Sequence, residues 1–181
     1  IRSETCCPYL DALGQGDAMI RDARPDDAAA IGAIWNPVIR DTAITFWPTE
    51  RSDAEIRAYM AAKQDAGHGV FIAETGGLIT GFAAYGQFRN GGGYAHSMEH
   101  TIYTAPAQRG SGLGAALLAH LEDHAQQRGA RLMIGAITGS NTGSIAFHAR
   151  HGYAEWGRIP AAGFKFGQWH ELILMGKDLS P

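Results

Sequence analysis

The sequence feature that most constrains this chain is a glycine-rich segment that leads directly into an apolar segment with helical spacing. Residues 108–130, QRGSGLGAALLAHLEDHAQQRGA, place Gly110, Gly112 and Gly114 within five positions. Glycine has no Cβ, so backbone N–H groups can approach a ligand closely, and at a helix N-terminus these groups and the helix dipole both favour an anion. A single glycine would indicate only a tight turn before a helix. Three glycines beside Arg109 favour a phosphate-binding turn.

Two familiar nucleotide-binding motifs fit this segment poorly. A Walker loop ends in Gly-Lys-Ser/Thr, whereas Gly112 is followed by Leu113 and Gly114, so no lysine is placed to reach a γ-phosphate. A dinucleotide fingerprint needs G-x-G-x-x-G early in a βαβ unit and an acidic residue about 20 positions later. The segment supplies only the first half of that fingerprint, after three expected strands.

The composition is that of a folded domain and excludes several partner classes. The chain has 181 residues, 45 % of them hydrophobic and 18 % charged, with a formal net charge of −3. This charge gives no general basic field, so nucleic acid is not expected as a partner. No apolar run approaches the roughly 18 residues of a membrane span, and no membrane contact is expected. We expect one domain over residues 18–181.

The first 17 residues read as a leader that is poorly ordered. Their sequence, IRSETCCPYLDALGQGD, carries acidic residues where a signal peptide would be continuously apolar, which indicates a cytoplasmic protein. Cys6 and Cys7 are neighbours and cannot link distant parts of the fold.

Turn signals and periodicity predict helices and strands without internal repeats. A strand at 19–24 precedes a helix opened by Pro25, which Pro37 is expected to bend or end. Ser52 and Glu55 form a capping box for a second helix that stops at Gly67. The later expected elements are strands at 69–74, 78–88 and 94–104, a helix at 112–128, a strand at 131–137, a helix at 141–150 and strands at 153–159 and 169–179. This order indicates an α+β domain with a mixed sheet.

The segment Arg109-Gly110-Ser111-Gly112-Leu113-Gly114 resembles the R/Q-x-x-G-x-G/A motif of the GNAT acetyltransferase superfamily, which cradles the pyrophosphate of coenzyme A. SMEHTIYTAPAQRGSGLG, NTGSIAFHARHGY and AAGFKFGQWHEL resemble, in this order, the branch that N-acetylates phosphinothricin and methionine sulfoximine. The resemblance extends over about residues 19–179. It implies the GNAT fold, a mixed central sheet of about seven strands flanked by about four helices. It also implies acetyl-CoA as donor, a primary amine as acceptor, no metal, and a homodimer.

Glu99 is the residue best suited to remove a proton from an ammonium group. It lies in the middle of an otherwise apolar or neutral strand, where partial burial would raise its pKa toward neutral pH. A carboxylate on a solvated strand face is the alternative. The family resemblance points to the same glutamate.

The segment HSMEH, from His96 to His100, also matches the H-x-x-E-H zinc signature. That signature needs a helix to bring both imidazoles to one metal. On a strand, positions four apart lie roughly 13 Å apart, too far for two zinc bonds of about 2 Å. Because residues 101–104 favour a strand, we expect no zinc site.

Two further cofactor contacts are implied by the resemblance. The backbone of Ile102, Tyr103 and Thr104 resembles the strand that pairs with the pantetheine arm, which requires an exposed strand edge. Asn141 resembles a pantetheine contact, and it also stands where it would cap a short helix.

Many superfamily members have a tyrosine where this chain has His148, and that tyrosine is the acid for the departing thiol. The histidine matches the phosphinothricin-like branch. Three roles therefore stay open for His148: protonating the thiolate, hydrogen bonding to the cofactor, or packing with its polar atoms satisfied.

The acceptor site is the least determined part of the sequence. QFRNGGGY follows the third strand and resembles the family's substrate loop, so Arg89 and Asn90 are the candidates for binding an acidic acceptor, against the alternative of a solvated arginine. Aromatic residues at Trp35, Phe46 and Trp169 fit either a pocket wall or the core. Residues 164–169 resemble a loop near the site.

These features together predict direct transfer of an acetyl group from acetyl-CoA to the amine of a small amino-acid-like acceptor. An acetyltransferase acting on a polyamine or a protein N-terminus is the enzyme alternative. A non-catalytic sensor of acyl-CoA is the non-enzyme alternative, and Glu99 argues against it.

Overall fold

The computed structural model describes residues 18–180, so the expected leader, with Cys6 and Cys7, lies outside the described residues. Its helices are α1 (Ala28–Asp41), α2 (Asp53–Asp65), α3 (Leu113–Gln127) and α4 (Thr142–Arg150). Its strands are β1 (Met19–Asp22), β2 (Val70–Thr75), β3 (Leu78–Gln87), β4 (Ser97–Thr104), β5 (Leu132–Thr138), β6 (Ala154–Lys165) and β7 (Gln168–Asp178). The α+β arrangement expected from the sequence is confirmed.

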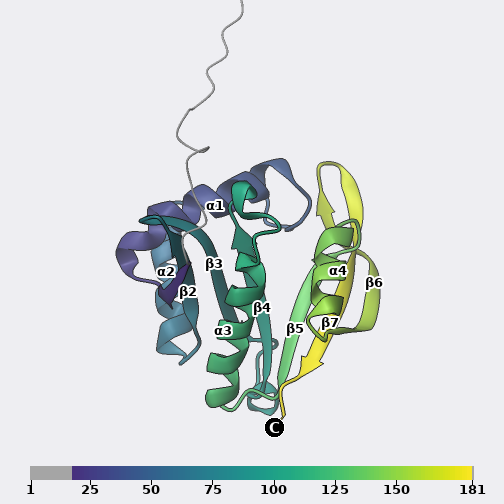
Figure 1. Ribbon diagram of the computed structural model, residues 1–181. Helices are drawn as coiled ribbons and strands as arrows, with labels where there is room; N and C mark the ends of the chain where they lie inside the picture. The colour runs from purple at the N-terminus through teal and green to yellow at the C-terminus, as the bar shows by residue number, and fades with distance from the viewer. Residues whose placement is uncertain (1–17, 181) are drawn as a thin grey trace, which may run out of the picture.

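The strands form a single mixed sheet in the order β1-β2-β3-β4-β5-β7-β6 (Figure 1). All neighbouring strands are antiparallel except β4 and β5, which are parallel. Parallel neighbours need a crossover connection, and α3 supplies it between β4 and β5. Seven strands and four helices match the expected GNAT fold.

The sheet is covered on both faces, and each face has its own core. Alternate residues of a strand point to opposite faces. In β2, Phe71 packs in the core beneath α3, whereas Ile72 packs in the core beneath α1 and α2. In β3, Ala83 and Phe82 divide in the same way. This alternation sends successive residues of β4 into different halves of the molecule.

The sheet forks between β4 and β5. Their pairing begins at Ser97 with Leu132 and ends at His100 with Gly135, although β4 continues to Thr104. Across the whole of residues 101–104, β4 remains paired with β3 on its other side. The last four residues of β4 therefore have one unpaired backbone edge, and Figure 1 shows the two strands diverging there.

Several local expectations are confirmed. The Ser52 side chain accepts a hydrogen bond from the backbone of Glu55, and the Glu55 carboxylate accepts one from the backbone of Ser52, which completes the capping box. Gly76 and Gly77, at φ of 60° and 79°, form the two-residue turn of the β2–β3 hairpin, a conformation that glycine favours.

Two expectations need correction. Pro37 does not end the first helix, since α1 continues through it to Asp41. β6 does not stop near residue 159 but runs to Lys165 with an irregular register between Ile159 and Gly163, so residues 164–169 form the end of the β6–β7 hairpin. Gly163 sits in the strand because a Cβ there would overlap the Phe46 ring, a close approach that its sequence neighbours do not reveal.

Lys165 connects the end of β6 to the segment between α1 and α2. It is only 6 % exposed, and its ammonium donates hydrogen bonds to the carbonyl oxygens of Ile39, at 2.6 Å, and Thr45, at 2.8 Å. Ile39 lies in the last turn of α1, where carbonyl groups have no partner within the helix. Lys165 thereby holds the connecting segment, residues 42–52, against the sheet.

Replacing Lys165 with methionine should lower the free energy of unfolding by about 1–3 kcal/mol, because two buried carbonyl groups lose a charged donor. Urea denaturation of the purified protein measures this change, and Arg57→Met, at an exposed position of α2, is the control with little effect. An unchanged denaturation midpoint in Lys165→Met would show that the two hydrogen bonds do not hold the segment.

Candidate active site

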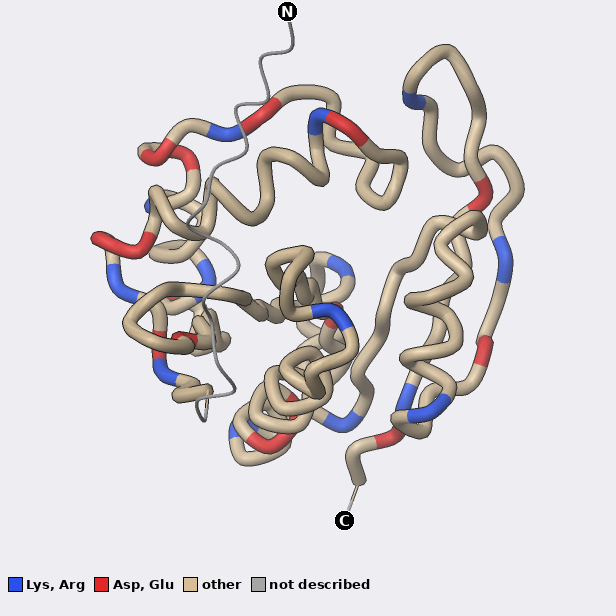
Figure 2. The backbone as a smooth tube through the Cα atoms, turned by 45° about the horizontal axis from the view of Figure 1, so that its top comes forward, with Lys and Arg blue, Asp and Glu red and all other residues tan. Residues whose placement is uncertain are grey.

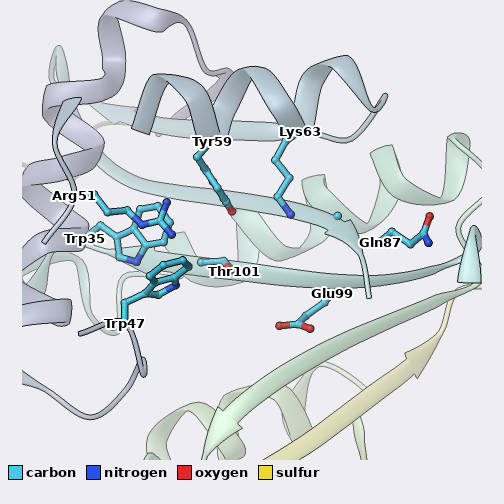
Figure 3. Close-up of a pocket in the computed structure, with 9 residues that line it drawn as sticks. Trp35, Trp47, Arg51, Tyr59, Lys63, Gln87, Glu99 and Thr101 are labelled. Atoms are coloured by element: carbon cyan, nitrogen blue, oxygen red, sulfur yellow. The ribbon is translucent and has the colours of Figure 1, made fainter. Parts of the chain in front are cut away.

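A cavity of about 200 Å³ opens on the face of the sheet covered by α1 and α2 (Figure 3). Its walls come from α1, the 42–52 segment, α2, β3 and β4. The lining residues are Trp35, Trp47, Arg51, Tyr59, Lys63, Gly86, Gln87, Glu99 and Thr101. Aromatic rings and cationic side chains thus surround one carboxylate.

Glu99 reaches the cavity because of its place in β4. It pairs with Gly86 of β3 and Ile134 of β5, at the forked part of the sheet. Burial raises the pKa of its carboxyl group, and the nearby Lys63 ammonium opposes that rise only in part. No side chain among residues 18–180 donates a hydrogen bond to it or pairs with it within 4 Å. A carboxylate with these properties is suited to accept a proton near neutral pH.

Lys63 projects from α2 over the strand pair that carries Glu99. Its ammonium occupies the space where a Cβ on Gly86 would lie, so a glycine at this position of β3 makes room for it. Burial lowers the pKa of Lys63, and Glu99 acts in the opposite direction. Figure 3 shows Lys63 and Tyr59 side by side, both pointing from α2 toward the strands.

Arg51 is held at the other end of the cavity by rings and by one amide. Its guanidinium carbon lies 3.9 Å from the ring centroid of Trp47 and 4.5 Å from that of Trp35. The side chain of Asn36 binds both the backbone N–H and the carbonyl oxygen of Arg51, at 2.9 Å each. The Nε atom of Arg51 is buried without a hydrogen-bond partner among the described residues.

The glycine-rich turn is a second candidate part of the site, separate from the cavity. Gly110 and Gly112 have φ of 79° and 88°, a conformation that favours glycine, and nothing lies within 4 Å of where their Cβ atoms would be. Gly112 directly precedes α3, so the first backbone N–H groups of that helix border this open space. Leu113 of the first turn packs beside Gly81, which pairs with Thr104. The turn therefore adjoins the unpaired end of β4.

Two histidines meet on the opposite face of the sheet from Glu99. His148, on α4, is 5 % exposed, and its Nδ1 lies 2.7 Å from the Ser144 carbonyl oxygen, to which it donates. Its Nε2 lies 3.3 Å from Nε2 of His100, and the rings are stacked. Because the proton of His148 is on Nδ1, its Nε2 is an acceptor. The hydrogen bond between the two rings is therefore donated by Nε2 of His100. Burial lowers the pKa of both, that of His100 to about 3.

The remaining predicted site residues do not line the cavity. Some of them lie near the glycine-rich turn, and the others are apart from both. Ile102, Tyr103 and Thr104 occupy the unpaired end of β4, and Asn141 caps α4 by accepting a hydrogen bond from the Ser144 backbone at 3.2 Å. Arg89 and Asn90 are exposed and are not among the residues that line the cavity.

The three aromatic residues that fit either a pocket wall or the core occupy different environments. Trp35 both lines the cavity and belongs to the core. Phe46 stacks on His170 instead, and Trp169 is 68 % exposed.

Sequence reasoning missed Arg51, Lys63 and His100. Arg51 precedes the cap of α2 and Lys63 lies in its last turn, positions that are ordinarily solvated. In the sequence, His100 stands out only as the last residue of the H-x-x-E-H zinc signature. In the described part of the chain no three histidine, cysteine, aspartate or glutamate side chains gather as metal ligands. His96 and His100 bind different partners, the Gly129 carbonyl and His148.

Charge elsewhere on the molecule is mixed. Figure 2 shows basic and acidic positions interspersed along the backbone. None of the helices within residues 18–180 has the length and apolar character that crossing a membrane requires. The cations in the cavity are therefore a local feature and not part of a broad basic surface.

Comparison with known proteins gives consistent matches. Residues 35–153 match the model of the acetyltransferase (GNAT) family. The chain is 37 % identical to the L-amino acid N-acyltransferase MnaT of Escherichia coli, with 88 % of this chain and 93 % of the relative covered. It is 36 % identical to the L-methionine sulfoximine/L-methionine sulfone acetyltransferase of Salmonella typhimurium, covering 88 % and 94 %.

Among solved structures, the chain resembles a GNAT superfamily phosphinothricin acetyltransferase from Sinorhizobium meliloti, crystallised in complex with acetyl-CoA. The TM-score is 0.86 at 32 % identity, with 90 % of this chain and 89 % of the other covered.

Proposed function

The chain belongs to the acetyltransferase (GNAT) family, and from that premise we propose that it moves the acetyl group of acetyl-CoA to the primary amine of a small amino-acid-like acceptor. The acceptors acetylated by its relatives, methionine sulfoximine, methionine sulfone and phosphinothricin, are of this class. The observation that carries the proposal is Glu99, a half-buried carboxylate of raised pKa in a cationic cavity at the fork of the sheet.

The residues at the fork fit the donor. Acetyl-CoA supplies an acyl group that is activated as a thioester. The open space at Gly110 and Gly112 lies at the N-terminus of α3 and suits its pyrophosphate, with Gly114 in the first turn of the helix and Arg109 beside them. The unpaired edge at Ile102, Tyr103 and Thr104 offers backbone groups to the amides of the pantetheine arm, and Asn141 is a further candidate contact.

Glu99 acts as the general base in this proposal. An amino acid is an ammonium ion at neutral pH, and its nitrogen becomes a nucleophile only after losing a proton. Glu99 accepts that proton, directly or through one water, and the raised pKa brings its basicity closer to that of the ammonium. No cysteine occurs after position 7, so the described residues offer no thiol relay, and the transfer is direct. The amine nitrogen bonds to the acetyl carbon, the C–S bond of the thioester breaks, and coenzyme A leaves as a thiolate that takes a proton from water.

The geometry favours packing or hydrogen bonding for His148 over proton donation to the thiolate. A proton donor needs a proton on the nitrogen that faces the leaving group. In His148 the proton is on Nδ1 and is bound to Ser144, while Nε2 accepts from His100. Since burial lowers the pKa of both rings, neither gains a second proton near neutral pH.

We also propose that a second copy of the chain covers the β6–β7 hairpin, as the resemblance to the family implies. β6 is an edge strand of twelve residues. Large apolar side chains are exposed on this hairpin: Trp156, Ile159, Phe164, Phe166 and Trp169, with Trp169 68 % exposed. Exposed apolar groups gathered on an edge strand favour association.

Glu99→Gln should lower kcat/KM for the amino acid acceptor by about 10²- to 10⁴-fold, the usual loss when a general base is removed. In the wild type, kcat/KM should fall as the pH decreases through the raised pKa of Glu99, because protonation removes the base. The variant should lack this acidic limb, and its deficit should shrink at high pH, where more amine is neutral. A thiol-release assay across pH measures both.

In the same assay Glu155→Gln, at an exposed position of β6, is the matched control. Near wild-type activity in Glu99→Gln at neutral pH would assign the base to another group.

Gly112→Ala should weaken coenzyme A binding by about tenfold or more, since a methyl group would enter the anion site and the backbone at φ of 88° favours glycine. Calorimetric titration with coenzyme A measures the change. Gly67→Ala is matched, because Gly67 has φ of 77°, open space around it and a place outside the site. Equal affinities in the two folded variants would move the pyrophosphate elsewhere.

A double replacement, Phe164→Ser with Trp169→Ser, should convert a dimer into a monomer, which light scattering after size exclusion measures. Leu78→Ser removes an exposed apolar side chain, 44 % exposed, at the distant β2–β3 turn and should leave the dimer intact. A wild-type protein that is monomeric at micromolar concentration would contradict the proposed dimer.

A further inference from the structure

Arg51 has no acidic partner, unlike the arginines that form ion pairs in the described structure. Arg21, Arg40 and Arg158 each bind at least two carboxylates within 4 Å. Within residues 18–180, no carboxylate lies within that distance of Arg51, and its buried Nε donor is unpartnered. A buried charged donor without an acceptor is costly, so its persistence in a cavity indicates that a ligand supplies the acceptor.

The surroundings of Arg51 leave only its hydrogen-bonding edge available. The guanidinium is close to the rings of both Trp47 and Trp35, and Tyr59 is 5.4 Å away. Aromatic rings stack on the face of a guanidinium and do not compete for its N–H groups, which lie in its plane. Asn36 fixes the backbone at the same residue. The side chain is therefore held in place before any ligand binds, which reduces the entropy lost on binding.

A second cation lies across Tyr59 from Arg51. The Lys63 ammonium is 5.4 Å from the centre of the Tyr59 ring, the same distance as the Arg51 guanidinium carbon. Glu99 is the one carboxylate among the lining residues described. Two cations and one anion complement a ligand with one ammonium and two acidic or oxygen-rich groups. A polyamine, with several positive charges and no anion, would be repelled.

The size of the cavity sets a limit on the acceptor. Its volume of about 200 Å³ is below the roughly 300–1,000 Å³ typical of sites for drug-sized ligands. A single amino acid with a short polar side chain suits such a space.

We infer that Arg51 is the specificity-determining residue for the acceptor: it binds the α-carboxylate through the edge of its guanidinium, while Lys63 binds oxygen atoms of the acceptor's side chain. This inference rests on the proposed function and names the substrate class more narrowly, as amino acids with a free carboxylate and an oxygen-rich side chain. It assigns to Arg51 the role that the sequence had suggested for Arg89, which is exposed and outside the cavity lining.

The test compares an acid with its own amide. Methionine sulfone and methionine sulfone carboxamide share the amine and the side chain and differ in the carboxylate, so their ratio of kcat/KM reports the carboxylate subsite. In the wild type the acid should be preferred. Arg51→Gln should raise KM for the acid by about 10- to 100-fold, as for a lost charge-assisted hydrogen bond, with the amide little changed. Arg51→Lys keeps the charge but lacks the planar guanidinium, so its KM for the acid should lie between those of the wild type and Arg51→Gln.

The controls separate this role from a structural one. Arg57→Gln removes an exposed arginine from α2 and should leave the acid preference intact. The affinity for acetyl-CoA and the melting temperature should be near wild type in Arg51→Lys, which retains the stacking cation. Lys63→Met should weaken methionine sulfone binding more than methionine binding, because only the sulfone offers side-chain oxygens.

Three results would overturn the inference. One is a wild type that acetylates acid and amide equally well; another is an Arg51→Gln variant that loses both to the same extent. The third is loss of the acid preference in Arg89→Gln with its retention in Arg51→Gln, which would assign the carboxylate to the loop after β3. A wild type that acetylates neither compound would contradict the proposed function itself. This result differs from the three above, which overturn only the role of Arg51.

Discussion

The end of the pairing between β4 and β5 is the constraint on which the rest of the structure depends. Backbone hydrogen bonds hold the two strands together as far as His100 and Gly135, and beyond that point each strand follows a different part of the molecule. The facing edges of residues 101–104 in β4 and 136–138 in β5 are thereby left unpaired, inside a sheet in which both strands keep their other neighbour. Because strand residues alternate between faces, Glu99 and His100, adjacent in sequence, lie on opposite faces of the sheet.

The unsatisfied polar groups of the described structure concentrate around this fork. Three buried side-chain nitrogens lack hydrogen-bond partners: Nε1 of Trp35, Nε of Arg51 and Nδ1 of His100. Two belong to residues that line the cavity at Glu99, and the third lies next to Glu99 in sequence, on the other face of the sheet. Folding alone would favour partners for each of them, so their grouping accords with the proposed role of this region in binding and catalysis. The raised pKa of Glu99 has the same origin, since burial disfavours its charge.

Local chemistry in the sequence predicted the helices and strands and the local structure of part of the candidate site. Glycines at 110 and 112, the capping box at Ser52 and the place of Glu99 within a strand depend on neighbouring residues, and each appears in the structure as expected. Arg51 and His100 were not predictable in this way. Their roles depend on contacts with Trp35, Asn36 and His148, which are distant in sequence and which no periodicity reveals.

Hydrogen–deuterium exchange with and without coenzyme A tests the central claim, that the fork and the adjoining glycine-rich turn form the donor site. The account predicts that binding slows exchange at residues 101–104, whose free edge would become paired, and at Gly114 and Ala115 in the first turn of α3, whose N–H groups would bind phosphate oxygens. Exchange in the β2–β3 hairpin near its turn, where the strands are paired with or without coenzyme A, should be unchanged. Unchanged exchange at residues 101–104, with protection confined to another part of the sheet, would contradict it.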